Sequence, residues 1–323
     1  MVAVDDASPD HTPEILADRG RRDPRLWWRR NLVRVGMVAN WRLVFELAVE
    51  RHPHAEYFAW ASDHDVWHPR WLEAMIAELD EHPEAVLAYP QSVVIDASGE
   101  LIRGPWSFDT GGVDNDRARL KAATRGMRAG EMVYGLFRIG PLKRAGVFRP
   151  VLWPDRLLLV ELTLEGTFRQ VPEVLWQRRF GPAEGTRATA RRQRRALYAG
   201  RPPLIAHLPW WLGHALALIR RAPAGPLTSR PQALSLAVRY LALTAPLELT
   251  RELLRVRNRV GTRAFRSSPR LARGLLSLER LSASAGRPVK LTPADPRRPG
   301  APPSNGGSCR RYRPSPWLKP GPH

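Results

Sequence analysis

The chain has 323 residues, of which 43% are hydrophobic, with a single cysteine and a formal net charge of +20. This length and apolar content allow one substantial folded domain with an appendage, and one cysteine excludes an intrachain disulfide. The charge is uneven, because residues 1–182 carry 24 Lys and Arg against 26 Asp and Glu, whereas residues 183–323 carry 27 against 5. The basic character therefore belongs to the C-terminal part.

The N-terminus and the most apolar segment of the chain indicate where in the cell the protein is expected. Asp5 and Asp6 follow closely on Met1, a pattern that is unlike a secretory signal. The window from Leu204 to Ile219 has two histidines and a proline, and it is shorter than the roughly 20 apolar residues that a spanning helix needs. We therefore expect a cytoplasmic protein.

In chain order, the first half alternates between apolar runs of strand length and helical patterns. Strands are predicted at 2–4, 57–61, 85–89, 92–95, 132–139 and 168–174. Helices are predicted from Thr12 onward and at 40–50, 71–79, 117–125 and 155–164. Such alternation predicts an α/β domain with a mainly parallel sheet.

Acidic residues follow two of the predicted strands. Asp5 and Asp6 end the first strand, and Asp63-His64-Asp65 follows the strand at 57–61. Because ligands bind beyond the carboxyl ends of parallel strands, the two clusters are predicted to meet in one cleft. Two carboxylates at a strand end can hold a hard divalent ion, and the alternative for this short motif is a capped turn.

Several motifs occur in the order typical of family 2 glycosyltransferases of the GT-A fold, which the chain resembles over residues 2–180. The segment 4–12 is similar to the family's Asp-Asp-x-Ser-x-Asp-x-Thr motif, and the segment 57–69 is similar to its Asp-x-Asp motif. Weaker landmarks are Asn31, Gly36, Asn40, residues 135–138, residues 171–173 and the pair Arg178-Arg179. The resemblance implies a nucleotide-sugar-binding domain and an inverting glycosyltransferase.

The resemblance also implies roles for the acidic clusters. Asp5 and Asp6 are expected to bind the donor, with Asp5 at its base, and Asp63 is expected at its ribose region. Asp65 is expected to bind a divalent cation, Mg²⁺ or Mn²⁺. His64 occupies the variable middle position, where an exposed loop histidine is favoured over a metal ligand.

An inverting transfer needs a general base that accepts the proton of the acceptor hydroxyl. Asp155, ahead of an apolar helix, lies where the family places its catalytic carboxylate, although helix N-capping is the alternative for this residue. Glu161 is the reserve candidate. Arg138, Arg178 and Arg179 are candidates for binding donor phosphates, with a surface ion pair as the alternative for each.

The chain departs from the family at its start, because the family's first strand and loop are missing before Val2. One expectation is that the true start lies upstream of Met1. The alternative is a noncatalytic relic of a transferase that acts as an interaction protein.

Three regions are predicted: a glycosyltransferase domain at 1–181, a basic amphipathic helical region at 182–266, and a disordered Pro/Arg/Gly-rich tail at 267–323. Basic helices within 188–273 either contact the anionic inner face of a membrane, with 204–219 as anchor, or pack on the domain. The expected partners are a nucleotide-sugar donor and a glycan or lipid-linked acceptor of the cell envelope. A nucleic-acid-binding protein is the remaining alternative, although no nucleic-acid-binding module is recognised.

Overall fold

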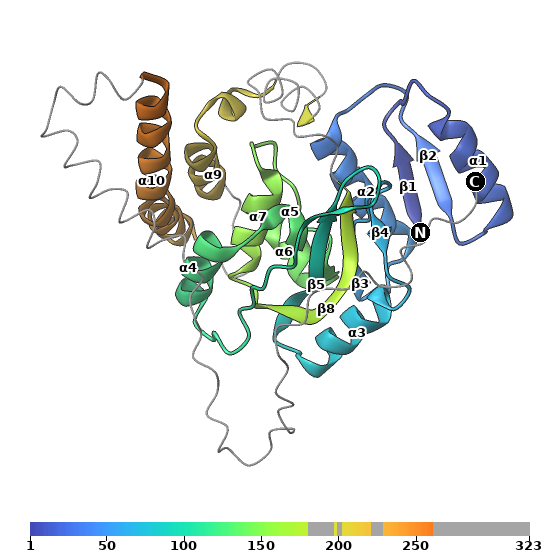
Figure 1. Ribbon diagram of the computed structural model, residues 1–323, viewed down its shortest axis with the longest axis horizontal. Helices are drawn as coiled ribbons and strands as arrows, with labels where there is room; N and C mark the ends of the chain where they lie inside the picture. The colour runs from blue at the N-terminus through green and yellow to red at the C-terminus, as the bar shows by residue number, and fades with distance from the viewer. Residues whose placement is uncertain (180–196, 199–201, 221–228, 261–323) are drawn as a thin grey trace, which may run out of the picture.

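The computed structural model describes residues 1–179, 197–198, 202–220 and 229–260. In this part of the chain a central twisted sheet carries helices on both faces, and a smaller two-stranded sheet lies to one side (Figure 1). The predicted α/β class is confirmed.

The main sheet is mixed. Its strand order is β3-β7-β5-β8-β4, with β6 paired to β5, and its only parallel pairing among the described residues joins β5 to β8. The bounds are β3 Tyr57–Phe58, β4 Val66–Trp67, β5 Ala85–Ile95, β6 Leu101–Arg103, β7 Leu136–Arg138 and β8 Thr167–Arg179. The small sheet pairs β1 (Val2–Asp5) with β2 (Trp27–Arg30) in parallel. In place of one mainly parallel sheet, the main sheet is mixed: its long β5–β8 pairing is parallel and its four shorter pairings are antiparallel, while the separate small sheet is parallel.

The strands predicted at 85–89 and 92–95 form one strand, β5. Its pairing with β8 changes register next to Pro90, and opposite this shift β8 advances from Val171 to Val174. Proline has no N–H to donate, so a bulge is the place where a central strand accommodates it. A pattern that looks interrupted in sequence is therefore continuous in the sheet.

The helices of the first half lie close to their predicted positions. They are α1 Thr12–Arg22, α2 Met37–Arg51, α3 Trp71–Glu81, α4 Asp116–Gly126, α5 Ala129–Met132, α6 Ile139–Ala145 and α7 Pro154–Leu162. The short α5 and α6 and the strands β2, β4 and β6 were not predicted, because segments of two to seven residues are too short to show periodicity.

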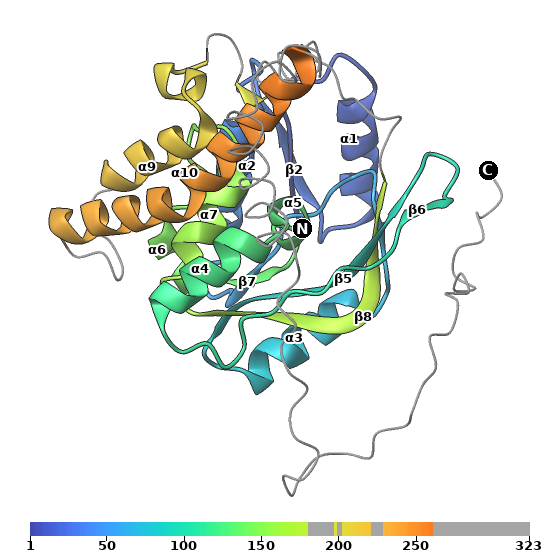
Figure 2. The same ribbon diagram turned by 60° about the vertical axis from the view of Figure 1, so that its left-hand side comes forward.

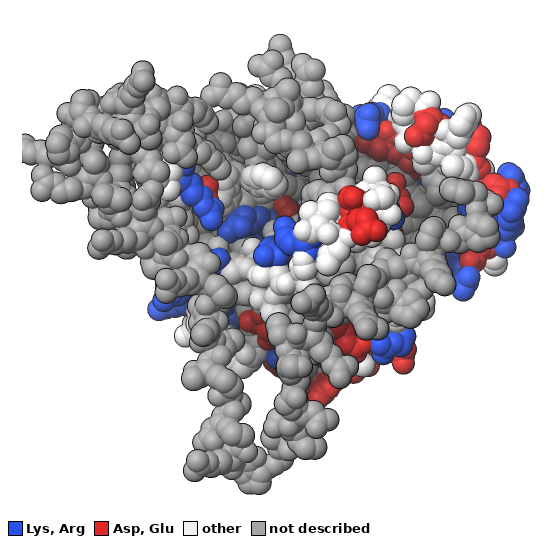
Figure 3. Space-filling model, viewed as in Figure 1, with Lys and Arg blue, Asp and Glu red and all other residues white. Residues whose placement is uncertain are grey.

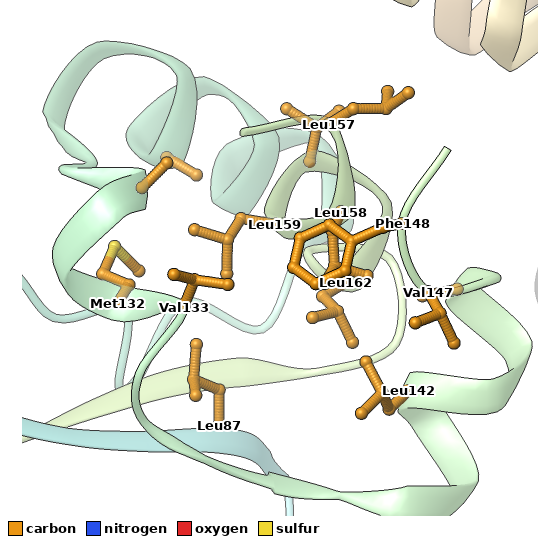
Figure 4. Packing of buried hydrophobic residues seen from close by; sticks show 14 of the residues in the cluster. Leu87, Met132, Val133, Leu142, Val147, Phe148, Leu157, Leu158, Leu159 and Leu162 are labelled. Carbon is orange, nitrogen blue, oxygen red and sulfur yellow. The ribbon is translucent and has the colours of Figure 1, made fainter. Parts of the chain in front are cut away.

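Buried apolar residues cover both faces of the main sheet. On one face, α3 places Trp71, Met75 and Leu79 against the sheet. On the other face a larger cluster joins β5 to α4, α5, α6 and α7, and Figure 4 shows Met132 and the leucines of α7 in this cluster. The core therefore holds the beginning of α7, and with it Asp155, against the sheet.

The C-terminal helices share this larger cluster. They are η1 Leu204–His207, α9 Trp210–Ile219 and α10 Arg230–Val260, and α9 and α10 lie side by side next to α4 and α7 (Figure 2). Ala215 and Leu218 of α9 and Leu236 and Tyr240 of α10 are buried together with residues of α7. Of the two alternatives for this region, the described part therefore packs on the domain.

This packing crosses the expected boundary at residue 181, since one core serves residues on both sides of it. The expected anchor at 204–219 is partly buried, with Gly213, His214 and Ala215 enclosed. None of the helices within the described ranges is long and apolar enough to cross a bilayer. The tail predicted to be disordered, 267–323, lies outside the described residues.

Candidate active site

A pocket of about 390 Å³ opens where α2 begins, α7 begins and β8 ends. Its polar groups are Tyr134, Asp155 and Arg178, and its walls are otherwise largely apolar. The apolar members include Met37, Val38, Trp41, Val133, Phe148, Leu152 and Trp153. An apolar pocket with a few converging polar groups is the usual form of a small-molecule site.

Asp155 lies in the first turn of α7, behind Pro154. Burial raises the pKa of its carboxyl above the ordinary value of 3.8, while the N–H groups of Arg156 and Asp155 and the charges of Arg156 and Arg178 lower it in part. Protein atoms surround the carboxyl deeply, yet the residue keeps partial contact with solvent through the pocket. Asp155 is therefore a stronger base than an exposed aspartate, and it is reachable from the pocket.

Asp155 is not the helix cap that the alternative interpretation required. The N-cap residue of α7 is Trp153, which has φ 54° and ψ 55° and makes no side-chain capping hydrogen bond. This left-handed conformation is uncommon for a residue other than glycine, and such strain concentrates at functional sites. The chain therefore turns sharply into α7 and sets Asp155 at the pocket.

The Asp63-His64-Asp65 loop is held to the end of β8 by Arg179. The backbone N–H of Arg179 donates to Asp65 Oδ1 at 2.8 Å, and its Nε donates to the His64 carbonyl at 3.3 Å. The Asp65 side chain is 1% exposed, whereas the Asp63 side chain is 99% exposed. His64 is exposed and pairs with Asp63 at 2.9 Å, which agrees with the loop histidine expected at this position.

Tyr134 lines the same pocket as Asp155. Its ring packs against Trp41 and Trp176 at centroid distances of 5.6 and 5.0 Å. Burial raises the pKa of Tyr134 to about 12; the charge of Arg178 lowers it, and the charges of Asp65, Asp155 and Asp63 raise it. The charges of three predicted acidic residues therefore act on one phenol, which stays protonated at neutral pH and can donate a hydrogen bond; of the three, Asp155 lines the pocket, whereas Asp63 and Asp65 lie outside its lining. No sequence signal distinguished Tyr134.

The described residues contain no cluster of three or more His, Cys, Asp or Glu side chains arranged for a metal. The acidic loop offers only the hard oxygen donors of Asp63 and Asp65, together with the His64 ring. Such a donor set fits Mg²⁺ or Mn²⁺ held by one or two carboxylates, with substrate phosphates and water as the remaining ligands.

Asp5 and Asp6 lie outside this pocket and shape a neighbouring loop. The Asp5 carboxylate is enclosed, accepts the Ser8 N–H at 3.2 Å and pairs with Arg30 at 3.2 Å. Asp6 accepts the backbone N–H groups of Val35 and Gly36, both at 2.8 Å. Asp6 thereby fixes the turn that leads into Met37 of the pocket wall, and the donor contacts expected of both residues stay predictions.

Arg138 was predicted to bind substrate, and the structure gives it a different role. Its guanidinium donates to the carbonyls of Ala85 at 2.9 Å and Leu79 at 2.6 Å. Ala85 begins β5, whereas Arg179 beside the acidic loop pairs with Ile95 at the other end of that strand. At about 3.3 Å per residue the two ends are roughly 30 Å apart. Arg138 therefore ties α3 to the sheet, far from the acidic loop.

The reserve base, Glu161, is also placed elsewhere. Its side chain is fully buried and pairs with Arg149, whose Nη2 and Nε lie 2.9 and 3.0 Å from Oε1. Six residues after Asp155, it lies on another side of α7, because a helix turns about 100° per residue. The structure thus leaves Asp155 as the carboxylate that lines the pocket.

Charges of both signs are interleaved on the face seen in Figure 3, where red and blue atoms lie next to one another at the centre and along the right edge. This mixture agrees with the near-balance of 24 basic and 26 acidic residues in 1–182. Most basic residues of the C-terminal part lie outside the described ranges.

Residues 1–132 match the model of the family described as Glycosyl transferase family 2. No curated protein matches the chain. Two solved structures are similar. The first is the mannosyltransferase PcManGT from Pyrobaculum calidifontis in complex with GDP-Man and Mn²⁺, which is 18% identical with a TM-score of 0.40 and covers 88% of this chain and 76% of its own. The second is GalNAc-T7 with UDP, GalNAc and Mn²⁺, which is 12% identical with a TM-score of 0.43 and covers 74% of this chain and 48% of its own.

Proposed function

Because residues 1–132 belong to glycosyl transferase family 2, we propose that this glycosyltransferase moves a sugar with inversion from a nucleoside-diphosphate sugar to an acceptor hydroxyl. The observation that carries the proposal is the Asp155 carboxylate on the wall of a pocket that also contains Tyr134 and Arg178. Asp155 is the proposed general base, and its raised pKa makes it a stronger base than an exposed aspartate.

In the proposed reaction the acceptor oxygen attacks the anomeric carbon on the side opposite to the diphosphate. The new C–O bond forms as the bond from that carbon to the diphosphate oxygen breaks, and the electron pair of the broken bond leaves with the diphosphate. Asp155 takes the acceptor's proton during the attack. A single displacement of this kind inverts the configuration of the anomeric carbon.

The departing diphosphate needs positive charge near it. Arg178 lines the pocket and is the side chain proposed to bind phosphate oxygens through its forked donors. Asp65, oriented by the Arg179 N–H, is the proposed ligand of a divalent cation, with Asp63 next to the donor's ribose. When bound, the cation would offset the negative charge of the leaving diphosphate.

The apolar walls of the pocket support an acceptor that carries an apolar group beside its reacting hydroxyl, such as a lipid-linked glycan precursor of the cell envelope. The exposed face of α10 supports a peripheral membrane contact. Its outward side chains Leu234, Val238, Leu249 and Leu253 are at least half exposed. Apolar side chains on a basic helix favour the anionic inner face of a membrane.

Nucleotide binding tests the donor site directly. With Mn²⁺ present, UDP or GDP at about 100 times its Kd should stabilise the protein by about 2.7 kcal/mol, measured as a rise in Tm. Asp65→Ala should abolish the Mn²⁺-dependent part of this rise, and Asp114→Ala, which removes an exposed loop carboxylate, should not. If neither nucleotide stabilises the protein while random DNA binds it with strong salt dependence, the transferase proposal is wrong and a nucleic-acid partner replaces it.

A further inference from the structure

A buried histidine of the C-terminal helices touches the segment that presents Asp155. His214 of α9 is completely buried, its Nε2 lies 2.6 Å from the Leu152 carbonyl oxygen, and its Nδ1 lies 2.8 Å from the Tyr240 hydroxyl on α10. Leu152 lies three residues before Asp155. The contact therefore links the two C-terminal helices to the strained turn at the pocket.

The protonation of His214 follows from its surroundings. Burial lowers the pKa of the imidazole from 6.5 to about 3, so the ring is neutral at physiological pH. A carbonyl oxygen can only accept, so the single ring proton is on Nε2 and is donated to Leu152. Nδ1 then accepts from Tyr240, whose phenol stays protonated because burial raises its pKa. The Leu152 carbonyl thus makes Nε2 of His214 the donor, and Nδ1 in turn accepts the Tyr240 proton.

The residue between this hydrogen bond and α7 is the strained one. Trp153 has φ 54°, and the residue is 55% exposed, so burial of the indole does not account for the conformation. A strained backbone persists only where its surroundings hold it. The His214 hydrogen bond holds the peptide immediately before Trp153.

The other side of Asp155 is held as well. The Arg156 guanidinium lies 5.1 Å from the ring centroid of Trp210 on α9, and its Nη2 donates to the Thr124 carbonyl at 2.7 Å. Residues on both sides of Asp155 therefore contact α9. Such contacts fix the direction of a carboxylate more tightly than the helix alone does.

We propose that His214 is a positioning residue for glycosyl transfer, which holds Asp155 in the pocket through its Nε2 hydrogen bond to the Leu152 carbonyl. This inference rests on the proposed role of Asp155 as general base. It makes α9 and α10 part of the catalytic unit, because they orient the base from a later part of the chain; the base and both helices follow the family-matched residues 1–132.

Glutamine and asparagine carry the same amide on side chains of different length, so substituting each for His214 tests this inference. In His214→Gln the amide nitrogen replaces Nε2 and can still donate to Leu152, whereas in His214→Asn the shorter side chain places its nitrogen near Nδ1 and cannot. We expect kcat to fall about 10- to 100-fold in His214→Asn and His214→Leu with little change in the donor KM, since a misplacement of about 1 Å can cost that much. His214→Gln should stay within a few-fold of the original kcat, and Tyr240→Phe should lie between.

Amide hydrogen exchange provides a readout that does not need turnover. In His214→Asn, but not in His214→Gln, the peptide covering residues 150–158 should exchange faster while exchange in β5 is unchanged. Should His214→Leu fail to fold, the Gln and Asn pair decides the question, since both keep a polar side chain. Equal kcat in the two variants, or equal exchange at 150–158, overturns the positioning role. If the unmodified protein transfers no sugar while the exchange difference is present, the proposed function has failed and the mechanical link remains.

Discussion

Residues 1–179 and the helices α9 and α10 have opposite roles at the candidate site: the first region supplies nearly all of the pocket lining, and the helices pack behind it. The first region brings acidic groups that substrate can reach: Asp63, on the loop before β4, is almost fully exposed, and Asp155, in the first turn of α7, keeps contact with solvent. The C-terminal helices contribute enclosed groups, such as His214 and Tyr240. Reactive groups must be reachable by substrate, whereas the groups that orient them act best where water and alternative rotamers are excluded.

The largest expected effect is on kcat, from a substitution of the proposed base in residues 1–179. Asp155→Asn should lower kcat by about 10²- to 10⁴-fold, because an amide cannot take the acceptor's proton. Nucleotide binding, measured by thermal shift, should be unchanged. Asp114→Asn, the same change in an exposed loop, is the matched control. Full turnover in Asp155→Asn would show that another group is the base.

The next test concerns whether the two regions fold as one unit. Leu218 of α9 is fully buried in the shared core, so Leu218→Ala should lower the free energy of unfolding by about 2–5 kcal/mol. Leu234→Ala, on the exposed face of α10, should change it by less than about 0.5 kcal/mol. Denaturant unfolding followed by tryptophan fluorescence and circular dichroism measures both. Two separate transitions would break the comparison, because the helices would then unfold independently.

The buried histidine predicts a dependence of stability on pH. The folded state holds His214 neutral down to about pH 3, whereas the unfolded state binds a proton near 6.5. The unfolded state therefore binds more protons between these values, and this group lowers stability as pH falls below 6.5, by about 1.4 kcal/mol per pH unit. His214→Gln should remove this part of the slope in denaturant unfolding between pH 7 and pH 5. An unchanged slope would mean that His214 is not held neutral in the fold.

The smallest expected effect concerns Arg178. A Cβ added at Gly130 would lie 3.1 Å from Arg178 Nη2, which is too close without a shift of the guanidinium. Gly130→Ala should therefore displace the guanidinium slightly and raise the donor KM by about two- to threefold, a fraction of the roughly 1.5–3 kcal/mol of a charge-assisted hydrogen bond. Gly140→Ala is the matched control, because its Cβ would meet Arg144 at an ordinary 3.5 Å. Steady-state kinetics with varied donor separates the two variants, and equal KM values would remove Arg178 from the donor site.

Sequence reasoning selected the acidic loop and Asp155 from local motifs; the structure places Asp155 on the pocket wall, and the roles of these residues stay predictions. It placed Arg138 at the substrate, although that side chain spans from β7 to the carbonyls of Ala85 and Leu79. The error has a physical cause: a long guanidinium reaches carbonyls that only the packing of α3 on the sheet brings near. Tyr134 was missed for a related reason, since its neighbours come from three separate segments.

The sequence by itself determined the α/β class, most helix positions, the two acidic clusters and the carboxylate ahead of α7. These features depend on periodicity, on turn residues and on short motifs, all of which act within a few neighbours along the chain. Only the tertiary structure decided that Asp65 is enclosed while Asp63 is exposed, that Asp5 is engaged by Arg30, and that His214 contacts Leu152. Burial and hydrogen-bond partners depend on residues distant in sequence, and their convergence is a property of packing.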